Sequence, residues 1–149
     1  MAGLQARSGS KTFNRIYLLR VFFNKQAKTG KNIKNMKGLF FSCNCLVSIG
    51  DISDWDVSNA KNMRGMFDGC KKFNCDISYW DVSNVEDISW MFADAESFNQ
   101  NLSRWNVKKV KQMYATFCEA KSFNYPLNNW DVSNVENMRS MFMDAVKFN

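Results

Sequence analysis

A repeat of 25 residues constrains the fold of this chain more than any other feature of its sequence. Tryptophan, valine, phenylalanine and a Phe-Asn pair each recur at that interval without a slip. The four columns are Trp55, Trp80, Trp105 and Trp130; Val57, Val82, Val107 and Val132; Phe67, Phe92, Phe117 and Phe142; and Phe73-Asn74, Phe98-Asn99, Phe123-Asn124 and Phe148-Asn149. One such unit is too short to bury its own apolar side, so the units are expected to stack into a solenoid.

The apolar spacing inside each unit predicts one short helix and one short strand. Apolar residues lie at i, i+3, i+4 and i+7, which is the pattern of one helical face. In one unit they are Met63, Met66, Phe67 and Cys70. Ser-x-x-Glu sequences that begin at Ser83 and Ser133 are typical of helix starts, and the Trp-x-Val segment alternates like a strand. We therefore predict an α/β, right-handed, leucine-rich-repeat-like solenoid of strand-plus-helix units.

The repeat also suggests how the chain is divided. Residues 32–149 are predicted to form four to five units, of which the first is degenerate and lacks its own tryptophan. Residues 1–31 form a basic segment, and the stretch 12–23 is predicted to be a helical N-terminal cap, with Ile16, Leu19 and Phe23 on one face. No such device is visible after the last repeat. We expect either that this open end is covered by a second copy, giving a homodimer, or by another partner, or that the chain is truncated.

One unit of the array carries a long and specific motif. It reads Trp-Asp-Val-Ser-Asn-Val-Glu-Asp-Ile-Ser-Trp-Met-Phe-Ala-Asp-Ala-Glu-Ser-Phe-Asn from Trp80 to Asn99. This motif, over about residues 32–149, resembles the BspA-like leucine-rich-repeat proteins. The resemblance implies a repeat fold with a binding role, because members of that family are typically surface proteins of bacteria and protists used in adhesion. It brings no catalytic residues.

The composition argues against an enzyme. The chain has no histidine, which removes the Ser-His-Asp and Cys-His arrangements and every histidine-containing metal site. It also has no glycine-rich phosphate loop, so we predict no catalysis and no cofactor. Cys43, Cys45, Cys70 and Cys75 could be drawn as a four-thiolate zinc site. However, Cys43 and Cys70 fall in the slot that later units fill with alanine, which favours small core residues.

Three recurring residue types are best explained by structure. The tryptophan column is predicted to be a buried stack in which each indole N–H needs an acceptor. The asparagine of each Phe-Asn pair is expected to bond the backbone of its own turn. Asp56, Asp81 and Asp131 each follow a tryptophan, and Asn106 replaces the aspartate in the third unit. Turn or capping duty is expected for these four residues.

The charge distribution is uneven along the chain. Residues 1–50 hold nine Lys/Arg and no Asp/Glu, whereas residues 51–149 hold eleven and fourteen. The third unit also departs from the consensus with basic residues where its neighbours have Asp, Ser, Asn and Glu. These basic residues are either a solvated face or contacts for a partner. The candidate contacts are Arg15, Arg20, Lys25, Lys28, Lys31, Lys34, Arg104, Lys108, Lys109 and Lys111.

The sequence therefore predicts binding to a macromolecule. The first hypothesis is a protein–protein interaction module, for example a small intracellular inhibitor of a nucleoprotein complex, such as a phage-type anti-defence protein. The alternatives are a fragment of a BspA-like surface adhesin and a nucleic-acid binder that uses the basic arm. No signal peptide or apolar run long enough to span a membrane is apparent. We expect a cytoplasmic protein, or a cell-surface protein if the chain belongs to a longer precursor.

Overall fold

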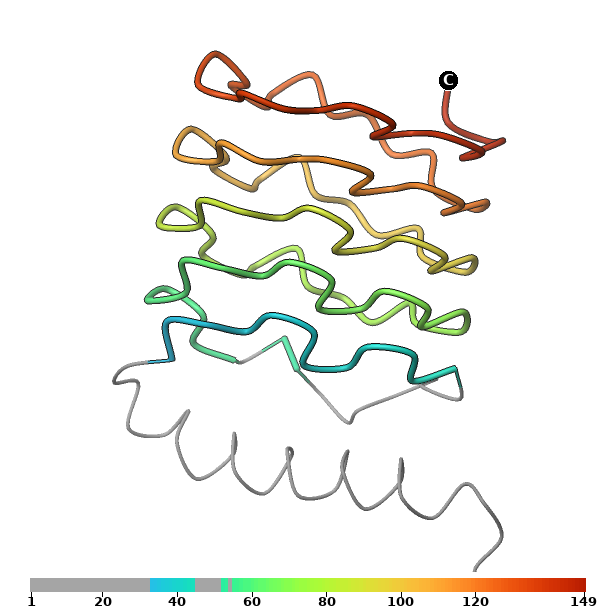
Figure 1. The fold of residues 1–149 in the computed structure, drawn as a ribbon, viewed down its shortest axis with the longest axis horizontal. Helices are drawn as coiled ribbons and strands as arrows, with labels where there is room; N and C mark the ends of the chain where they lie inside the picture. The colour runs from blue at the N-terminus through green and yellow to red at the C-terminus, as the bar shows by residue number, and fades with distance from the viewer. Residues whose placement is uncertain (1–32, 45–51, 54) are drawn as a thin grey trace, which may run out of the picture.

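The computed structural model describes residues 33–44, 52–53 and 55–149, which stack as successive coils (Figure 1). Four parallel β-bridges connect one residue of each coil to the equivalent residue of the next. The bridged residues are Asn35, Asn62, Asp87, Gln112 and Asn137, and we number coils 1 to 5 from these positions. Coil 2 is thus 62–86, coil 3 is 87–111, coil 4 is 112–136, and coil 5 begins at Asn137.

The prediction of strand-plus-helix units is wrong for this part of the chain. Throughout the described ranges there is no α-helix, and the only β-structure is the isolated bridges. The predicted cap helix over 12–23 lies outside the described residues. The apolar residues predicted to form a helical face instead lie on a run of tight turns that brings them to the same side.

Hydrogen bonds show why these turns do not continue into a helix. In coil 2 the N–H groups of Met66, Asp68 and Cys70 donate to carbonyls three residues back, at 3.0–3.3 Å. Between these bonds, Gly65 and Gly69 have φ angles of +58° and +73°. A left-handed residue every four positions interrupts a right-handed helix. The segments that begin at Ser83 and Ser133 likewise start turns and no helix.

The backbone N–H groups that form no hydrogen bond within the turns join each coil to the next. Met63, Gly65, Phe67 and Gly69 donate their N–H groups to the carbonyls of the next coil, at 2.8–2.9 Å. The acceptors are Asp87, Ser89, Met91 and Ala93, and coils 1, 3 and 4 make the same kind of bonds to the coil that follows. Every second peptide group in these turns therefore points along the stack. Its N–H is directed toward the coil that follows in the sequence.

This alignment predicts uneven hydrogen exchange. The amides of Met113 and Phe117 donate to coil 5, whereas the equivalent amides of Met138 and Phe142 have no acceptor within the described ranges. Because exchange requires a bonded amide to open, we expect the coil 5 amides to exchange faster by on the order of 100-fold. Amide exchange followed by NMR measures this directly. Equal protection at the two sets of positions would contradict it.

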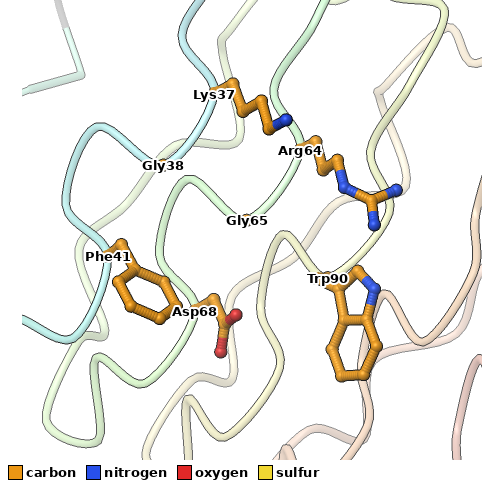
Figure 2. Close-up of a pocket in the computed structure, with 7 residues that line it drawn as sticks. All are labelled: Lys37, Gly38, Phe41, Arg64, Gly65, Asp68 and Trp90. Atoms are coloured by element: carbon orange, nitrogen blue, oxygen red, sulfur yellow. The ribbon is translucent and has the colours of Figure 1, made fainter.

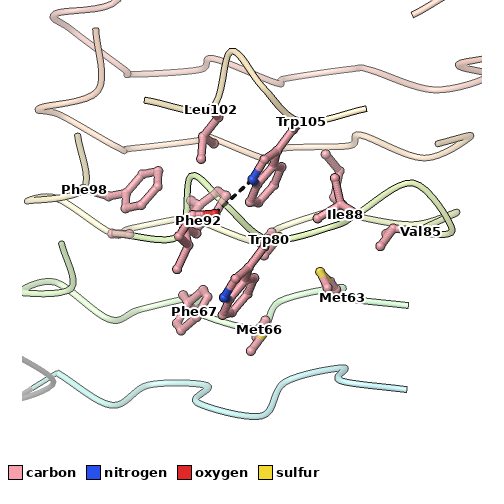
Figure 3. Packing of buried hydrophobic residues seen from close by; sticks show 14 of the residues in the cluster. Met63, Met66, Phe67, Trp80, Val85, Ile88, Phe92, Phe98, Leu102 and Trp105 are labelled. Carbon is pink, nitrogen blue, oxygen red and sulfur yellow. Dashed lines mark hydrogen bonds between the residues drawn. The ribbon is translucent and has the colours of Figure 1, made fainter. Parts of the chain in front are cut away.

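Aromatic rings fill the interior as columns that run through the stack (Figure 3). Phe92 stacks on Phe67 below and Phe117 above, with ring centroids 5.9 and 5.4 Å apart. A second phenylalanine column lies against the first, and the Phe92 and Phe98 centroids are 4.1 Å apart. Each of these residues is completely buried. The core therefore consists of the same residue positions in every coil, packed on one another from coil to coil.

The tryptophan column confirms the prediction of a buried stack with bonded indoles. Trp55 and Trp80 stack at 6.3 Å and 7°, and Trp105 and Trp130 at 6.4 Å and 1°. The indole N–H groups of Trp80, Trp105 and Trp130 donate to backbone carbonyls of the preceding coil, at 2.8, 3.1 and 3.0 Å. Each of these carbonyls also accepts the backbone N–H of the tryptophan three residues later, so the bond satisfies the buried indole and adds a link between two coils.

The predictions for the two recurring polar positions, the aspartates that follow tryptophan and the asparagines of the Phe-Asn pairs, differ in how they fare. The expected turn duty of the aspartates is confirmed, since Asp56, Asp81 and Asp131 accept from the N–H two residues later, at 3.0–3.1 Å. Asn106 does the same at 3.2 Å. The expectation that the asparagine column bonds its own turn is wrong. These side chains accept from the backbone of the next coil, as Asn74 does from Asn99 at 2.8 Å.

The left-handed positions predict an unusual stabilising substitution. Exposed Glu119 has a φ of +56° in the slot that glycine fills in coil 2. This conformation costs an ordinary residue about 1–2 kcal/mol, while glycine costs about 0.4–1 kcal/mol in the unfolded chain. Glu119→Gly should therefore raise the free energy of unfolding by about 0.5–1 kcal/mol. Urea denaturation checks this, and Lys72→Gly, at an exposed turn residue without a positive φ, should lower stability instead.

Candidate binding groove on the turn face

The side chains that alternate with the core positions in the turns lie on one side of the coils, which we call the turn face; among them Ser89, Ala93, Ala115 and Cys118 are buried. Three slots define it. They are Lys37, Arg64, Ser89, Tyr114 and Arg139; Gly38, Gly65, Trp90, Ala115 and Ser140; and Phe41, Asp68, Ala93, Cys118 and Met143. The residue type in each slot changes along the stack, for example from Gly38 and Gly65 to Trp90, whereas the intervening core slots repeat methionine and phenylalanine with little change.

A groove of about 670 Å³ crosses the turn face over coils 1 to 3 (Figure 2). It is lined by Lys37, Gly38, Phe41, Arg64, Gly65, Asp68 and Trp90. In Figure 2 Gly65 and Asp68 lie between Phe41 on one side and Trp90 on the other, and Gly38 lies on the Phe41 side. The volume is within the range of roughly 300–1,000 Å³ that is typical of ligand pockets.

Glycine keeps this groove open. Gly38 and Gly65 have φ angles of +59° and +58°, but Trp90 and Ala115 adopt the same conformation at +60° and +52°. A Cβ atom added to Gly65 would lie 3.7 Å from the Asp68 Cβ, an ordinary contact. The fold therefore tolerates side chains in this slot, and their absence from coils 1 and 2 creates the hollow.

The Trp90 side chain, which forms one wall of the groove, is held in place by contacts on its other side. Its ring meets the Tyr114 ring edge-on, with centroids 5.1 Å apart and planes at 65°. Both rings pack against a small cluster of buried residues, Ala93, Ala115 and Cys118. Trp90 is the one tryptophan of five that lies outside the 25-residue column. A half-buried tryptophan fixed by its neighbours can bind without first losing side-chain freedom.

Charges of both signs border the groove. Lys37 and Arg64 line it without forming an ion pair to any residue that the structure describes. Asp68 also lines the groove, and the acidic side chain of Asp94 is near enough to affect it. Burial, and to a smaller extent the neighbouring Asp94, raises the pKa of Asp68 above its ordinary value of 3.8. The carboxylate of Asp68 is therefore the least well solvated charge of the groove.

The raised pKa of Asp68 predicts a pH-dependent effect on stability. A carboxyl whose pKa is raised by folding opposes folding when it is ionised, and the cost develops as the pH rises above its unfolded pKa of 3.8. Asp68→Asn should therefore raise the free energy of unfolding at pH 7 by about 0.5 kcal/mol, after allowance for solvent screening. At about pH 3 the gain should vanish, because both states of the wild type are then protonated. Urea denaturation at the two pH values compares them, and an equal gain at both would contradict the electrostatic cause.

The structure brings together only some of the basic residues predicted from the sequence. Lys108, Lys109 and Lys111 line a second hollow of about 370 Å³, together with Glu86, Asn134 and Glu136. Arg104 lies over the Tyr79 ring at 5.0 Å instead, and Lys34 is exposed and lines neither hollow. The remaining five lie outside the described residues: Arg15, Arg20, Lys25, Lys28 and Lys31.

The lysines of this second hollow are mixed with acidic and amide groups. Lys109 Nζ donates to Asn84 Oδ1 at 2.7 Å. Glu86, which also lines the hollow, pairs with Lys61 at 3.3 Å. A continuous basic track, of the kind that follows a phosphate backbone, is not formed by these three lysines.

The groove residues were missed by the sequence reasoning, although a signal was present. Gly38 and Gly65 occupy equivalent positions in two matching segments, and Trp90 follows in the same slot of the next unit. Comparing the non-core slots between units would have drawn attention to this change from glycine to tryptophan. The grouping of Phe41 and Asp68 with them depends on the turns, which the helical interpretation misplaced.

Three further findings concern the cysteines, metal binding and membrane-spanning helices. Cys43 and Cys70 are buried in the slot of the alanines, as predicted, and Cys70 Sγ lies 3.0 Å from the carbonyl oxygen of Phe40. In the part of the chain that the structure describes, no group of three His, Cys, Asp or Glu side chains is placed to hold a metal ion. That same part contains no helix of the length and apolar character that crossing a membrane requires.

Comparisons with known proteins place the chain in a family. A family model described as "Mycoplasma protein of unknown function, DUF285" matches residues 21–149. Comparison with curated proteins and with solved structures gave no match. Because the matched residues make up most of the chain, including all the repeats, this protein belongs to the DUF285 family.

Proposed function

We propose that this chain is a non-catalytic binding module that contacts a protein partner through its turn face. The observation that carries the proposal is the contrast between slots. Core slots repeat from coil to coil, whereas the turn-face slots change from Gly38 and Gly65 to Trp90, and from Phe41 to Asp68. Because all these slots have the same backbone, folding alone does not require the differences. Tryptophan and arginine are also the residue types that most often dominate protein interfaces.

A protein partner is favoured over a nucleic acid by the charges that the structure displays. The lysines of the second hollow are interspersed with Glu86 and Glu136, and the groove contains Asp68 beside Arg64. A phosphate backbone would meet like charge at both places, which weakens binding. A protein surface can match both signs at once.

The setting of this binding is also a proposal. The resemblance of the repeats to BspA-like proteins, together with the DUF285 match, supports a role in attaching one macromolecule to another. A surface adhesin and a small intracellular inhibitor would both use a face of this kind. Between these settings, we retain the intracellular interaction module as the first hypothesis and the adhesin as the alternative.

Quantitative affinity capture from the source organism tests the proposed function. The bait proteins are the wild type, a double variant with Trp90→Ala and Arg64→Glu, and a control with Tyr79→Ala. Tyr79 is 68% exposed and lies in no slot of the turn face. We expect a set of proteins that the wild type and the control capture and the double variant loses by at least about 30-fold. Capture that is unchanged in the double variant would refute the turn face as the binding surface.

A further inference from the structure

We propose that the groove over coils 1 to 3 receives a short peptide segment in which an apolar side chain is followed closely by Asp or Glu. This inference rests on the proposed function and names the chemistry of the partner at this site. It follows from three properties of the groove, which are its apolar walls, its glycine floor and the separation of its charges.

The apolar walls provide a seat for one side chain. Phe41 is 54% exposed, although its ring is large and apolar. Trp90 lies on the opposite side of the groove, with Asp68 between the two aromatic residues (Figure 2), and is fixed by Tyr114. Covering two aromatic rings removes apolar surface from water, which favours binding. An aliphatic or aromatic side chain is the group that gains most from this position.

The floor allows the peptide to approach closely. Gly38 and Gly65 present backbone to the groove where Trp90 projects a side chain from the same slot of the next coil. Anything bound there lies against the turns themselves. Filling the slot with a side chain that the fold already carries in coil 3 would therefore block the groove without requiring a new backbone conformation.

The charges select an acidic residue beside the apolar one. Lys37 and Arg64 both line the groove and have no ion-pair partner among the described residues. A guanidinium binds a carboxylate through two parallel hydrogen bonds, which fixes orientation as well as charge. Asp68 adds a negative charge to the groove, and this disfavours ligands with many anionic groups, such as nucleic acids and sulfated sugars. One or two carboxylates match the groove better.

The experiment uses the full chain and a phage-displayed library of random 12-residue peptides. Enriched peptides are then synthesised, and their affinities are measured by fluorescence anisotropy against the wild type and four variants. Trp90→Ala removes a wall, Arg64→Glu reverses the charge, Gly65→Trp fills the groove, and Tyr79→Ala is the control. Glucuronic and sialic acid oligosaccharides serve as small anionic probes in the same assay.

We expect peptides in which an apolar residue is followed within three positions by Asp or Glu. Trp90→Ala and Gly65→Trp should each weaken their binding at least about 30-fold, Arg64→Glu about 10-fold or more, and Tyr79→Ala less than about twofold. Gly65→Trp keeps the Trp90 cluster intact, so its effect separates loss of the groove from loss of folding. Amide exchange of coils 3 and 4 confirms that each variant is folded.

Several outcomes would overturn the inference. They are enrichment of basic peptides, no enrichment at all, binding that persists in the Gly65→Trp variant, and binding of the acidic sugars without binding of peptides. These results are distinguishable from failure of the proposed function. Host proteins that depend on the turn face but not on Gly65 leave the proposed function standing, whereas peptide binding without any captured partner leaves only the groove chemistry.

Discussion

Replacing Trp105 with alanine is expected to lower the free energy of unfolding by about 3–5 kcal/mol. The side chain is only 2% exposed. It stacks on Trp130 at 6.4 Å and lies beside Phe92 at 6.1 Å, and its indole N–H donates to the Ile77 carbonyl at 3.1 Å (Figure 3). Truncation removes both the packing and the bond between two coils. The midpoint of urea denaturation, followed by circular dichroism, measures the loss.

Trp105→Phe separates the two contributions. Phenylalanine retains a ring in the column but cannot donate a hydrogen bond, so the Ile77 carbonyl keeps only the bond from the Trp80 N–H, at 3.1 Å. The lost indole bond contributes about 0.5–1.5 kcal/mol, and the smaller ring adds to the loss. We expect the phenylalanine variant to fall between the wild type and Trp105→Ala. A loss below about 1 kcal/mol for Trp105→Ala would show that the column does not support the fold as argued.

Phe92→Ala should cost a similar amount, about 3–5 kcal/mol. Phe92 is completely buried in the middle coil and stacks on Phe67, Phe98 and Phe117. Because each coil contacts only its neighbours, a cavity here weakens the link between the two halves of the stack. Urea denaturation gives the total loss, and amide exchange shows whether coils 4 and 5 open first.

Phe148→Ala is the matched control for this prediction. Phe148 belongs to the second phenylalanine column and is only partly buried, in coil 5, where it stacks on Phe123 and Phe142. Its loss should cost clearly less than that of Phe92, at about 1–2 kcal/mol. Equal costs at the two positions would contradict the account in which the columns are strongest in the middle of the stack.

The repeat predicted which residues are buried but misjudged the backbone that buries them. Met63, Met66, Phe67 and Cys70 are all buried in the structure, although they lie on turns. The spacing of a helical face and the spacing of these turns bring the same positions inward. The turns differ from a helix by a positive φ at positions that coil 2 fills with Gly65 and Gly69, and glycine favours that conformation. Later coils fill the same positions with residues such as Trp90, Ala115 and Glu119. Because these residue types do not favour a positive φ, the local sequence gives no signal for it there.

The candidate site shows a similar division. Lys108, Lys109 and Lys111 could be expected to lie together because they are neighbours in the sequence, and they line one hollow. The groove residues come from three coils, and their grouping depends on how the turns superpose. Phe41, Gly65 and Trp90 are each separated by more than 20 residues in the chain.

The sequence by itself determined the period, the buried columns and the aspartate turns, because side-chain burial and short-range hydrogen bonds follow from spacing along the chain. Only the tertiary structure decided the direction of the peptide groups and the shape of the turn face. In coils 1 to 4 the left-handed residues donate their N–H groups to the next coil, as Gly65 donates to Ser89. Such bonds join residues about 25 positions apart. They exist only after the coils have stacked, so no single unit specifies its own backbone.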